Sequence, residues 1–359
     1  MYIYSCKLIK FLIVINLIFS FKVNSQTPFF TSNVNLSENE LSNFYSSFSI
    51  DNSQVYFNSN DYYLHVFDKK TGNLNWSYNI SKKSNETPKL NNTSVFVNKH
   101  FSEFENKCLQ LNTITGEIIQ TLSIESINSR PFYKDSIMYC TAIDKELGGT
   151  LLAYDLKNNK TLWKQFIAHG VDKHPYYLSN KIIANVEEDN WFEIDYKGSL
   201  KDTICKKQNN LFVENIKCVN NFIYLSHDGK EISKKFLKEH LGTYEDLKMI
   251  TNKHFTFILE YNKLLILKDK LKVHKELEVD QIVRVPDDAI NEYREILKVD
   301  ENYIWFFYEN RVVVYDYIKN ETKKIIDLSE WMAHQIVLDD NQIWLISKKD
   351  GQLVGLKIE

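Results

Sequence analysis

The sequence predicts an all-β fold built from one repeated unit. Three observations lead to that prediction: a recurrent turn pattern, evenly spaced prolines, and many short runs of β-forming residues. The turn pattern is Asp or Asn, then Gly or Asn four residues later, then a larger residue four further on. Its copies are Asp68, Gly72, Trp76; Asn112, Gly116, Gln120; Asp155, Asn159, Trp163; and Asp316, Asn320, Lys324. The first three copies start 44 and 43 residues apart. A period of about 40 residues made of short strands is typical of a β-propeller with four-stranded antiparallel blades.

Each unit begins with a run rich in Val, Ile, Tyr and Phe, and a second run follows it. The first runs are Val55–Asn58, Val95–Asn98, Ile137–Thr141 and Tyr303–Tyr308, and the second runs are Leu64–Phe67, Leu151–Tyr154 and Arg311–Tyr315. These are short strands bounded by polar turns. The turn pattern then lies between the second and third strands of a unit, where Asp accepts backbone N–H groups and Gly or Asn takes a positive φ. Trp76 and Trp163, which follow the turn, are expected to pack between adjacent blades.

Three prolines repeat the same period. Pro88, Pro131 and Pro175 are separated by 43 and 44 residues. Proline suits the first residue of a strand, where no ladder N–H is required. We therefore expect each proline to mark the beginning of an innermost strand.

The number of units follows from the spacing. Asp195 continues the series, and the chain from Asp195 to Asp316 leaves room for two more units. One has strands His254–Glu260 and Lys263–Lys268. The other begins at Phe222–Ser226 and continues into 231–247, where the apolar residues are spaced as on one face of a helix.

The last unit has runs Ile343–Ser347 and Leu353–Ile358 and is one strand short. A stretch near residues 28–36 would supply the missing outer strand, close the ring and remove an exposed sheet edge. We therefore expect eight blades, or seven if the degenerate fifth unit is not a blade.

The N-terminal residues resemble a secretory signal peptide. Lys7 and Lys10 precede the apolar run Phe11–Phe21, and Val23 and Ser25 occupy the positions that signal peptidase recognises. The prediction is a signal peptide over residues 1–25 and one propeller domain over 26–359, exported to the periplasm or the extracellular space. Removal of residues 1–25 takes away three lysines and no acid, so the net charge falls from -3 to -6. This charge argues against a nucleic-acid partner.

Four cysteines remain in the exported chain: Cys108, Cys140, Cys205 and Cys218. Their spacing matches no zinc motif, and four cysteines allow three pairings. A Cys205–Cys218 bridge between neighbouring strands and a set of buried free thiols are both open alternatives.

The motifs also resemble a known family. The segments VYFNSNDYYLHVFDKKTGNLNW (55–76) and LLAYDLKNNKTLW (151–163) resemble the pyrroloquinoline-quinone-like repeat of quinoprotein propellers and of a propeller subunit in outer-membrane assembly machinery. The resemblance implies a propeller fold, but the family contains both enzymes and non-enzymes. Its dehydrogenases use adjacent cysteines over the quinone and a calcium set of Glu, Asn and Asp. This sequence has no adjacent cysteines and no residues onto which that set maps. The resemblance therefore favours the non-enzymatic branch, with no cofactor.

The residues before the three prolines are the first candidate site. Thr87, Arg130 and His174 should lie where inner strands enter the sheets, around the mouth of the central channel, and could bind an anionic ligand or a partner loop. A second candidate is a metal site from His169, Asp172 and His174 with the acidic residues 187–189. Ordinary solvated loops are the alternative interpretation of both sets.

These observations lead to two functional hypotheses. The first is an exported, non-catalytic scaffold that holds an envelope or secreted protein. The second is a quinone- or metal-dependent oxidoreductase using pyrroloquinoline quinone with calcium, or a carbohydrate-active propeller with a funnel site around Arg130 and His174.

Overall fold

The computed structural model shows an all-β chain made of short antiparallel sheets. It describes residues 27–34, 46–81, 87–102, 105–144, 148–168, 175–186, 190–205, 207–208, 211–212, 222–224, 231–241, 248–268, 272–283 and 293–358. Within these residues, seven sheets have four strands each and two further pairs have two strands. The all-β class and the four-stranded antiparallel sheets that the sequence predicts are confirmed.

The first four sheets follow one another in chain order, each built from four consecutive strands. They are β2 (Ser47–Ile50), β3 (Gln54–Asn58), β4 (Tyr63–Asp68) and β5 (Leu74–Asn79); β6 (Lys89–Asn91), β7 (Ser94–Ser102), β8 (Glu105–Asn112) and β9 (Ile118–Thr121); β10 (Phe132–Lys134), β11 (Ile137–Asp144), β12 (Gly148–Asp155) and β13 (Lys160–Ala168); and β14 (Tyr176–Tyr177), β15 (Lys181–Val186), β16 (Asn190–Asp195) and β17 (Leu200–Cys205).

Three more four-stranded sheets lie in the C-terminal part. They are β22 (Lys248–Thr251), β23 (Phe255–Glu260), β24 (Lys263–Lys268) and β25 (Lys272–Glu278); β26 (Glu295–Val299), β27 (Tyr303–Tyr308), β28 (Arg311–Asp316) and β29 (Glu321–Asp327); and β30 (Ala333–Asp339), β31 (Gln342–Ser347) and β32 (Leu353–Lys357) with β1 (Pro28–Thr31). The short helix α4 (Val279–Val283) follows β25.

The degenerate fifth unit differs from the others in its secondary structure. The pairs β18 (Lys207–Gln208) with β19 (Leu211–Phe212) and β20 (Phe222–Tyr224) with β21 (Glu231–Ser233) are followed by helix α3 (Lys234–Leu241). The helix that the apolar spacing predicts is therefore present at 234–241, while residues 242–247 lie outside the described residues.

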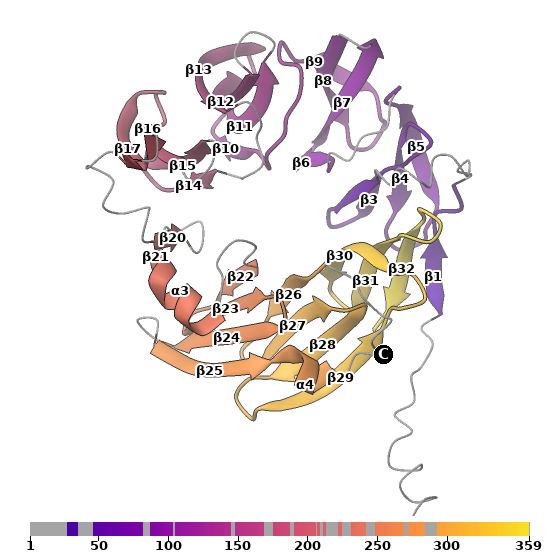
Figure 1. The fold of residues 1–359 in the computed structure, drawn as a ribbon. Helices are drawn as coiled ribbons and strands as arrows, with labels where there is room; N and C mark the ends of the chain where they lie inside the picture. Colours follow the sequence, from indigo (N-terminus) through magenta and orange to yellow (C-terminus); the bar gives the residue numbers. More distant parts are fainter. Residues whose placement is uncertain are drawn as a thin grey trace, which may run out of the picture.

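The sheets are arranged around a common middle (Figure 1). In six of the seven four-stranded sheets the first strand lies towards the middle and the last at the perimeter, and in the seventh β30 lies towards the middle and β1 at the perimeter. We call these the inner and outer strands. Pro88, Pro131 and Pro175 directly precede the inner strands β6, β10 and β14, as predicted. One expectation is wrong: the repeated turn joins the third and fourth strands, not the second and third. The inner strands β2, β6, β10 and β14 have only two to four residues, so the runs visible in the sequence are the second and third strands of these sheets.

The two ends of the described chain meet in one sheet. β1 pairs antiparallel with β32, so the N-terminal strand is the outer strand of the sheet that contains β30. The rings of Phe29 and Phe30 lie 5.4 and 5.3 Å from that of Trp344 in this sheet, and Phe30 lies 5.1 Å from Phe67 in the sheet of β2–β5. Strand β1 thus links the last sheet to the first.

The repeated turns have the predicted conformation. The Oδ1 atom of Asp68 accepts hydrogen bonds from the backbone N–H of residues 70 and 71, at 3.1 and 2.6 Å. Asn112, Asp155 and Asp316 accept the same pair of bonds in their turns. The fifth residue of the turn has a positive φ in every case, at Gly72, Gly116, Asn159 and Asn320. These bonds fix where each outer strand begins.

Every outer strand that follows such a turn carries a bulge at one place. At the bulge the outer strand has one extra residue that pairs with nothing on the neighbouring strand. This extra residue directly precedes Trp76, Gln120, Trp163 and Lys324, and it also precedes Lys275 of β25. A bulge re-aims the side chain beside it. The large residue of the repeat is thereby directed at the next sheet.

The tryptophans contact the turn of the following sheet. The Nε1–H of Trp76 donates to the carbonyl of Thr113 at 3.0 Å, and that of Trp163 to the carbonyl of Tyr196 at 3.1 Å. Each carbonyl belongs to the residue just after the Asp or Asn of the next turn. The predicted packing of the tryptophans between blades is confirmed.

The glycines of these turns are required for space as well as for φ. A Cβ on Gly116 would lie 2.7 Å from the Trp76 ring, one on Gly198 2.5 Å from Trp163, and one on Gly72 2.8 Å from Phe30. Where the preceding outer strand carries Gln120 or Lys275 instead, the turn residue is Asn159 or Asn320. A ring on the preceding outer strand therefore requires glycine in the turn, whereas the turn after Lys324 has Gly351 although no ring covers it.

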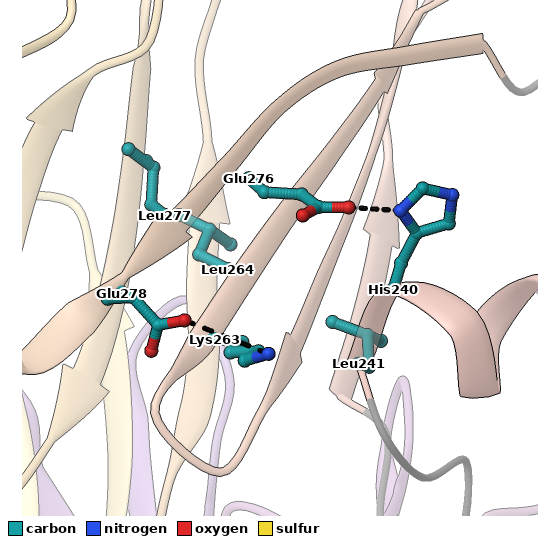
Figure 2. Close-up of a pocket in the computed structure, with 7 residues that line it drawn as sticks. All are labelled: His240, Leu241, Lys263, Leu264, Glu276, Leu277 and Glu278. Carbon is teal, nitrogen blue, oxygen red and sulfur yellow. Dashed lines mark hydrogen bonds and ion pairs between the residues drawn. The ribbon is translucent and has the colours of Figure 1, made fainter.

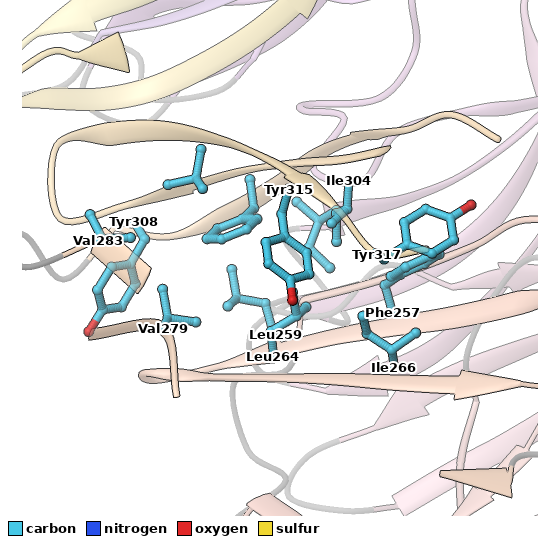
Figure 3. Close-up of a cluster of buried hydrophobic side chains, with 13 residues drawn as sticks. Phe257, Leu259, Leu264, Ile266, Val279, Val283, Ile304, Tyr308, Tyr315 and Tyr317 are labelled. Atoms are coloured by element: carbon cyan, nitrogen blue, oxygen red, sulfur yellow. The ribbon is translucent and has the colours of Figure 1, made fainter. Parts of the chain in front are cut away.

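The core consists of six clusters of apolar side chains, most of them between neighbouring sheets. The largest lies between the sheets of β22–β25 and β26–β29 and includes Phe257, Ile304 and Tyr317 (Figure 3). Because middle strands have neighbours on both faces, they are buried throughout, as in β3 and β31, whereas outer strands such as β5 are largely exposed. Continuous burial explains why middle strands appear as unbroken apolar runs.

Two of the cysteines are free thiols. Cys108 and Cys140 are buried in one cluster with Phe96 and Tyr154. Burial raises the pKa of both thiols, to about 12 for Cys140, so they remain protonated. The alternative of buried free thiols holds for this pair, while the Cys205 side chain and Cys218 lie outside the described residues.

The aromatic-over-glycine contact can be tested by a double-mutant cycle. Gly116→Ala should lower the free energy of unfolding by about 3 kcal/mol, because the left-handed conformation costs a non-glycine residue about 1–2 kcal/mol and the Trp76 ring must also move. In a Trp76→Ala background the same change should cost only about 1–2 kcal/mol. Urea unfolding of the four proteins gives the coupling; equal costs in both backgrounds would show that the ring does not select glycine.

Candidate functional site at the inner strands

The inner strands bring one residue set of each sheet to the same place. The inner strands of the sheets lie around the common middle of the arrangement (Figure 1). We call the first residues of these strands, together with the residues just before them, the channel mouth. Side chains from different sheets can converge there, which a single sheet would not allow.

Hydrogen bonds between sheets hold the inner strands together. The Oγ–H of Ser49 on β2 donates to the carbonyl of Pro88 at 2.5 Å. Gln335 on β30 accepts from the N–H of Phe48 at 3.2 Å and donates to the carbonyl of the same residue at 3.1 Å. The two-way bond of Gln335 joins the sheet of β30 directly to the sheet of β2.

Two of the three residues predicted for this site are described. Thr87 is half-buried just before β6, and Arg130 is exposed just before β10, so both lie at the starts of inner strands of successive sheets. His174 lies outside the described residues, as do His169, Asp172 and residues 187–189 of the predicted metal site. The role of Thr87, Arg130 and His174 in binding stays a prediction.

Sequence reasoning missed three titratable residues at equivalent positions. Lys248 and Glu295 are the first residues of β22 and β26, and His334 is the second residue of β30. No proline precedes these strands, so the marker that points to the other inner strands is absent. Their place at the start of the strand that precedes the two apolar runs of a unit is the signal that would have found them.

Burial shifts the pKa of two members of this group. It raises the pKa of Glu295 above its ordinary value, although Lys248 opposes the shift. Burial lowers the pKa of His334, and the nearby Lys348 adds to the effect. Both shifts favour the neutral form. Tyr293, whose ring lies 6.4 Å from that of His334, accepts the N–H of Ile336 at 3.3 Å and so joins β30 to the start of β26.

Buried hydroxyl groups add a further polar feature near this end. Ser59 follows β3 and Ser347 ends β31, the second strands of the two sheets joined by Gln335. Both Oγ atoms are buried without a protein hydrogen-bond partner, as is that of Ser46 just before β2. Buried hydroxyls of this kind are normally satisfied by bound water.

A separate pocket lies between α3 and the sheet of β22–β25. It has a volume of about 200 Å³ and is lined by side chains that include Leu241, Leu264 and Leu277. His240 of α3 pairs with Glu276 of β25, and the Lys263 ammonium lies 3.7 Å from the Glu278 carboxylate (Figure 2). Lys263 offsets the charge of Glu278, and the His240–Glu276 contact attaches α3 to the outer strand.

Metal and membrane features are absent from the part of the chain that the structure describes. Its His, Cys, Asp and Glu side chains form no group of three or more that could hold a metal ion. No helix within the described ranges is long and apolar enough to span a membrane.

The raised pKa of Glu295 gives a pH-dependent prediction. Because the folded protein binds this proton more tightly than the unfolded chain, ionisation costs stability as pH rises above the ordinary value of 4.5. Glu295→Gln should therefore raise the melting temperature at pH 7 and give no gain at pH 3. The exposed Glu330→Gln is the control in the same thermal scans; an equal gain for both variants, or none for Glu295→Gln at pH 7, would contradict the assignment.

Comparison with known proteins supports the fold and the repeat. No curated protein sequence matches the chain. The computationally designed Ika8 protein has a TM-score of 0.60 and 12% identity over 93% of this chain and 100% of its own, which shows a shared propeller fold. BamB from Moraxella catarrhalis has a TM-score of 0.44 and 11% identity over 87% of this chain and 82% of its own. Residues 31–165 match a family described as outer membrane protein assembly factor BamB. This part of the chain, which contains both quoted motifs, therefore carries the repeat of the pyrroloquinoline-quinone-like propeller family.

Proposed function

We propose that the protein is an exported, non-catalytic propeller that holds another protein of the bacterial cell envelope at its channel mouth. The observation that carries the proposal is the match of residues 31–165 to a family described as an outer-membrane protein assembly factor. A family with that description acts on other proteins, and the repeat supplies a rigid frame for doing so.

The channel mouth offers polar groups from several sheets to a protein ligand. Burial favours the neutral forms of Glu295 and His334. Arg130 is exposed at the same end and provides a forked donor for carbonyl or carboxylate groups. A polar surface with an exposed arginine fits a loop of another polypeptide.

We also propose that the ring has eight units and is closed by the N-terminal strand. Strands β20 and β21 with α3 lie between the sheets of β14–β17 and β22–β25, in the fifth place (Figure 1). The β1–β32 pairing and the Gln335–Phe48 bonds support closure between the last and first sheets.

Export rests on residues 1–25. Intact-mass measurement of the protein recovered from the periplasm or medium tests this part of the proposal. A mass that begins at Gln26 is expected; an unprocessed cytoplasmic chain would contradict it.

Site-specific crosslinking tests the scaffold proposal. A photoreactive amino acid at Arg130 should give one discrete crosslinked product in envelope preparations, because this position faces the bound protein. The same group at Ile325, which is 42% exposed on the outer strand β29, is the control and should give none. Equal products from both positions would show that crosslinking is unspecific, and no product from Arg130 would place the partner elsewhere.

The enzymatic hypothesis has its own measurement. A ligand that binds the folded state raises its melting temperature. Pyrroloquinoline quinone with calcium should leave the melting temperature of residues 26–359 unchanged under the scaffold proposal, and a saturable rise would contradict it.

A further inference from the structure

The groove between β25 and the β28–β29 turn is the feature from which a further inference follows. We propose that this groove binds a planar aromatic side chain of tryptophan size, presented by a partner polypeptide. The aromatic class follows from the structure alone; the polypeptide source rests on the proposed function.

The fold contains the same slot in several copies, and the clearest ones hold an aromatic ring. Each slot lies between the residue after the bulge of one outer strand and the turn of the next sheet. Trp76 and Trp163 fill two of these slots, and Phe30 lies over the turn of a third. The chain thus shows which group the space accepts.

The slot after β25 has no ring of its own. Lys275 occupies the place of the tryptophan, immediately after the bulge. Asn320 occupies the place of the glycine and is exposed, whereas Gly116 is half-buried and Gly198 is buried beneath their rings. A groove of about 500 Å³ lies here, with Lys275, Leu277, Tyr315 and Thr322 among its lining residues.

The groove offers the contacts that an aromatic ring uses. The Lys275 ammonium lies 5.6 Å from the centre of the Tyr315 ring and donates to its hydroxyl at 2.9 Å. A second ring laid against this ammonium gains a cation–π contact. Leu277 supplies apolar surface, and the Glu278 carboxylate at the groove edge can accept an indole N–H.

In another slot, the residue that replaces the tryptophan makes its hydrogen bonds within the protein. Gln120 also replaces a tryptophan, but its Nε2 donates to the carbonyl of Leu156 at 3.1 Å and to the Oε1 of Gln110 at 2.7 Å. The bond from Gln120 to the Leu156 carbonyl corresponds to the bonds that Trp76 and Trp163 donate to a carbonyl of the next turn. Lys275 instead bonds the Tyr315 hydroxyl, and a groove of about 500 Å³ remains beside Asn320.

Titration of the mature protein with acetyl-Gly-Trp-Gly-amide tests the proposal. Saturable binding is expected, with shifts of the Asn320 and Thr322 amide resonances and no shift at Gly116, whose slot is filled. Lys275→Trp should weaken binding at least tenfold, because the new ring occupies the groove. Lys272→Trp, an exposed change on the same strand, is the matched control and should bind like the parent.

Further arms separate the alternatives. Trp163→Ala empties a filled slot, and free indole should then raise the melting temperature of this variant. That rise would show that a slot of this kind can bind an added aromatic ring. Equal binding of acetyl-Gly-Leu-Gly-amide, binding unaffected by Lys275→Trp, or amide shifts confined to other sheets would overturn the proposal. Binding of free indole without binding of the peptide would overturn the polypeptide source. The amide shifts are measured on the parent protein and do not depend on the folding of a variant.

The outcome is independent of the channel mouth. If the peptide binds this groove while the Arg130 crosslink fails, the groove assignment stands and the proposed mouth is wrong. If the crosslink succeeds and the peptide does not bind, the reverse holds.

Discussion

The structure depends on one contact, in which a side chain from an outer strand lies over the turn of the next sheet. Trp76 over Gly116 shows its parts: a bulge aims the ring, the Asx turn presents a carbonyl, and a glycine leaves room for the ring. Sheets whose middle strands are apolar on both faces need neighbours on both sides. This contact fixes the spacing between neighbours at the perimeter, where the inner strands are too far away to do so.

The same contact explains how the chain varies from unit to unit. A large ring requires a glycine opposite, whereas Gln120 and Lys275 face Asn159 and Asn320. The requirement runs one way, because Lys324 precedes a turn that has Gly351 at the same place. At the ends of the chain β1 takes part in the same arrangement, since Phe30 lies over Gly72 as a tryptophan would. Strand β1, which lies far from β32 in the sequence, thus makes the same aromatic-over-glycine contact as the outer strands of the repeat.

Much of this fold could be predicted from the sequence, for identifiable reasons. Middle strands such as β3 and β28 are continuous apolar runs, and the Asp68 turn combines a polar acceptor with a residue of positive φ. Inner strands of two to four residues, such as β14 and β2, are too short to produce a pattern; a preceding proline reveals β14, and no such marker precedes β2. The bulges depend on pairing and leave no local signal. Lys248, Glu295 and Lys275 were missed because their units lack the proline or the turn that identifies the others, although Thr87 and Arg130 fall where the period places them.

Pairing of β1 with β32 also sets the order in which the chain can be completed. The ribosome makes residues 28–31 early and their partners 354–356 near the end of synthesis. Strand β1 therefore has no pairing partner until almost the whole chain has been made. Contacts of such long sequence separation slow folding. During that time Phe29 and Phe30 have no Trp344 to contact, and they are exposed aromatic surface on an unpaired strand. A chain released before its last few residues would keep this strand without its partner, which makes completeness of the C-terminus a condition for solubility as well as for the final fold.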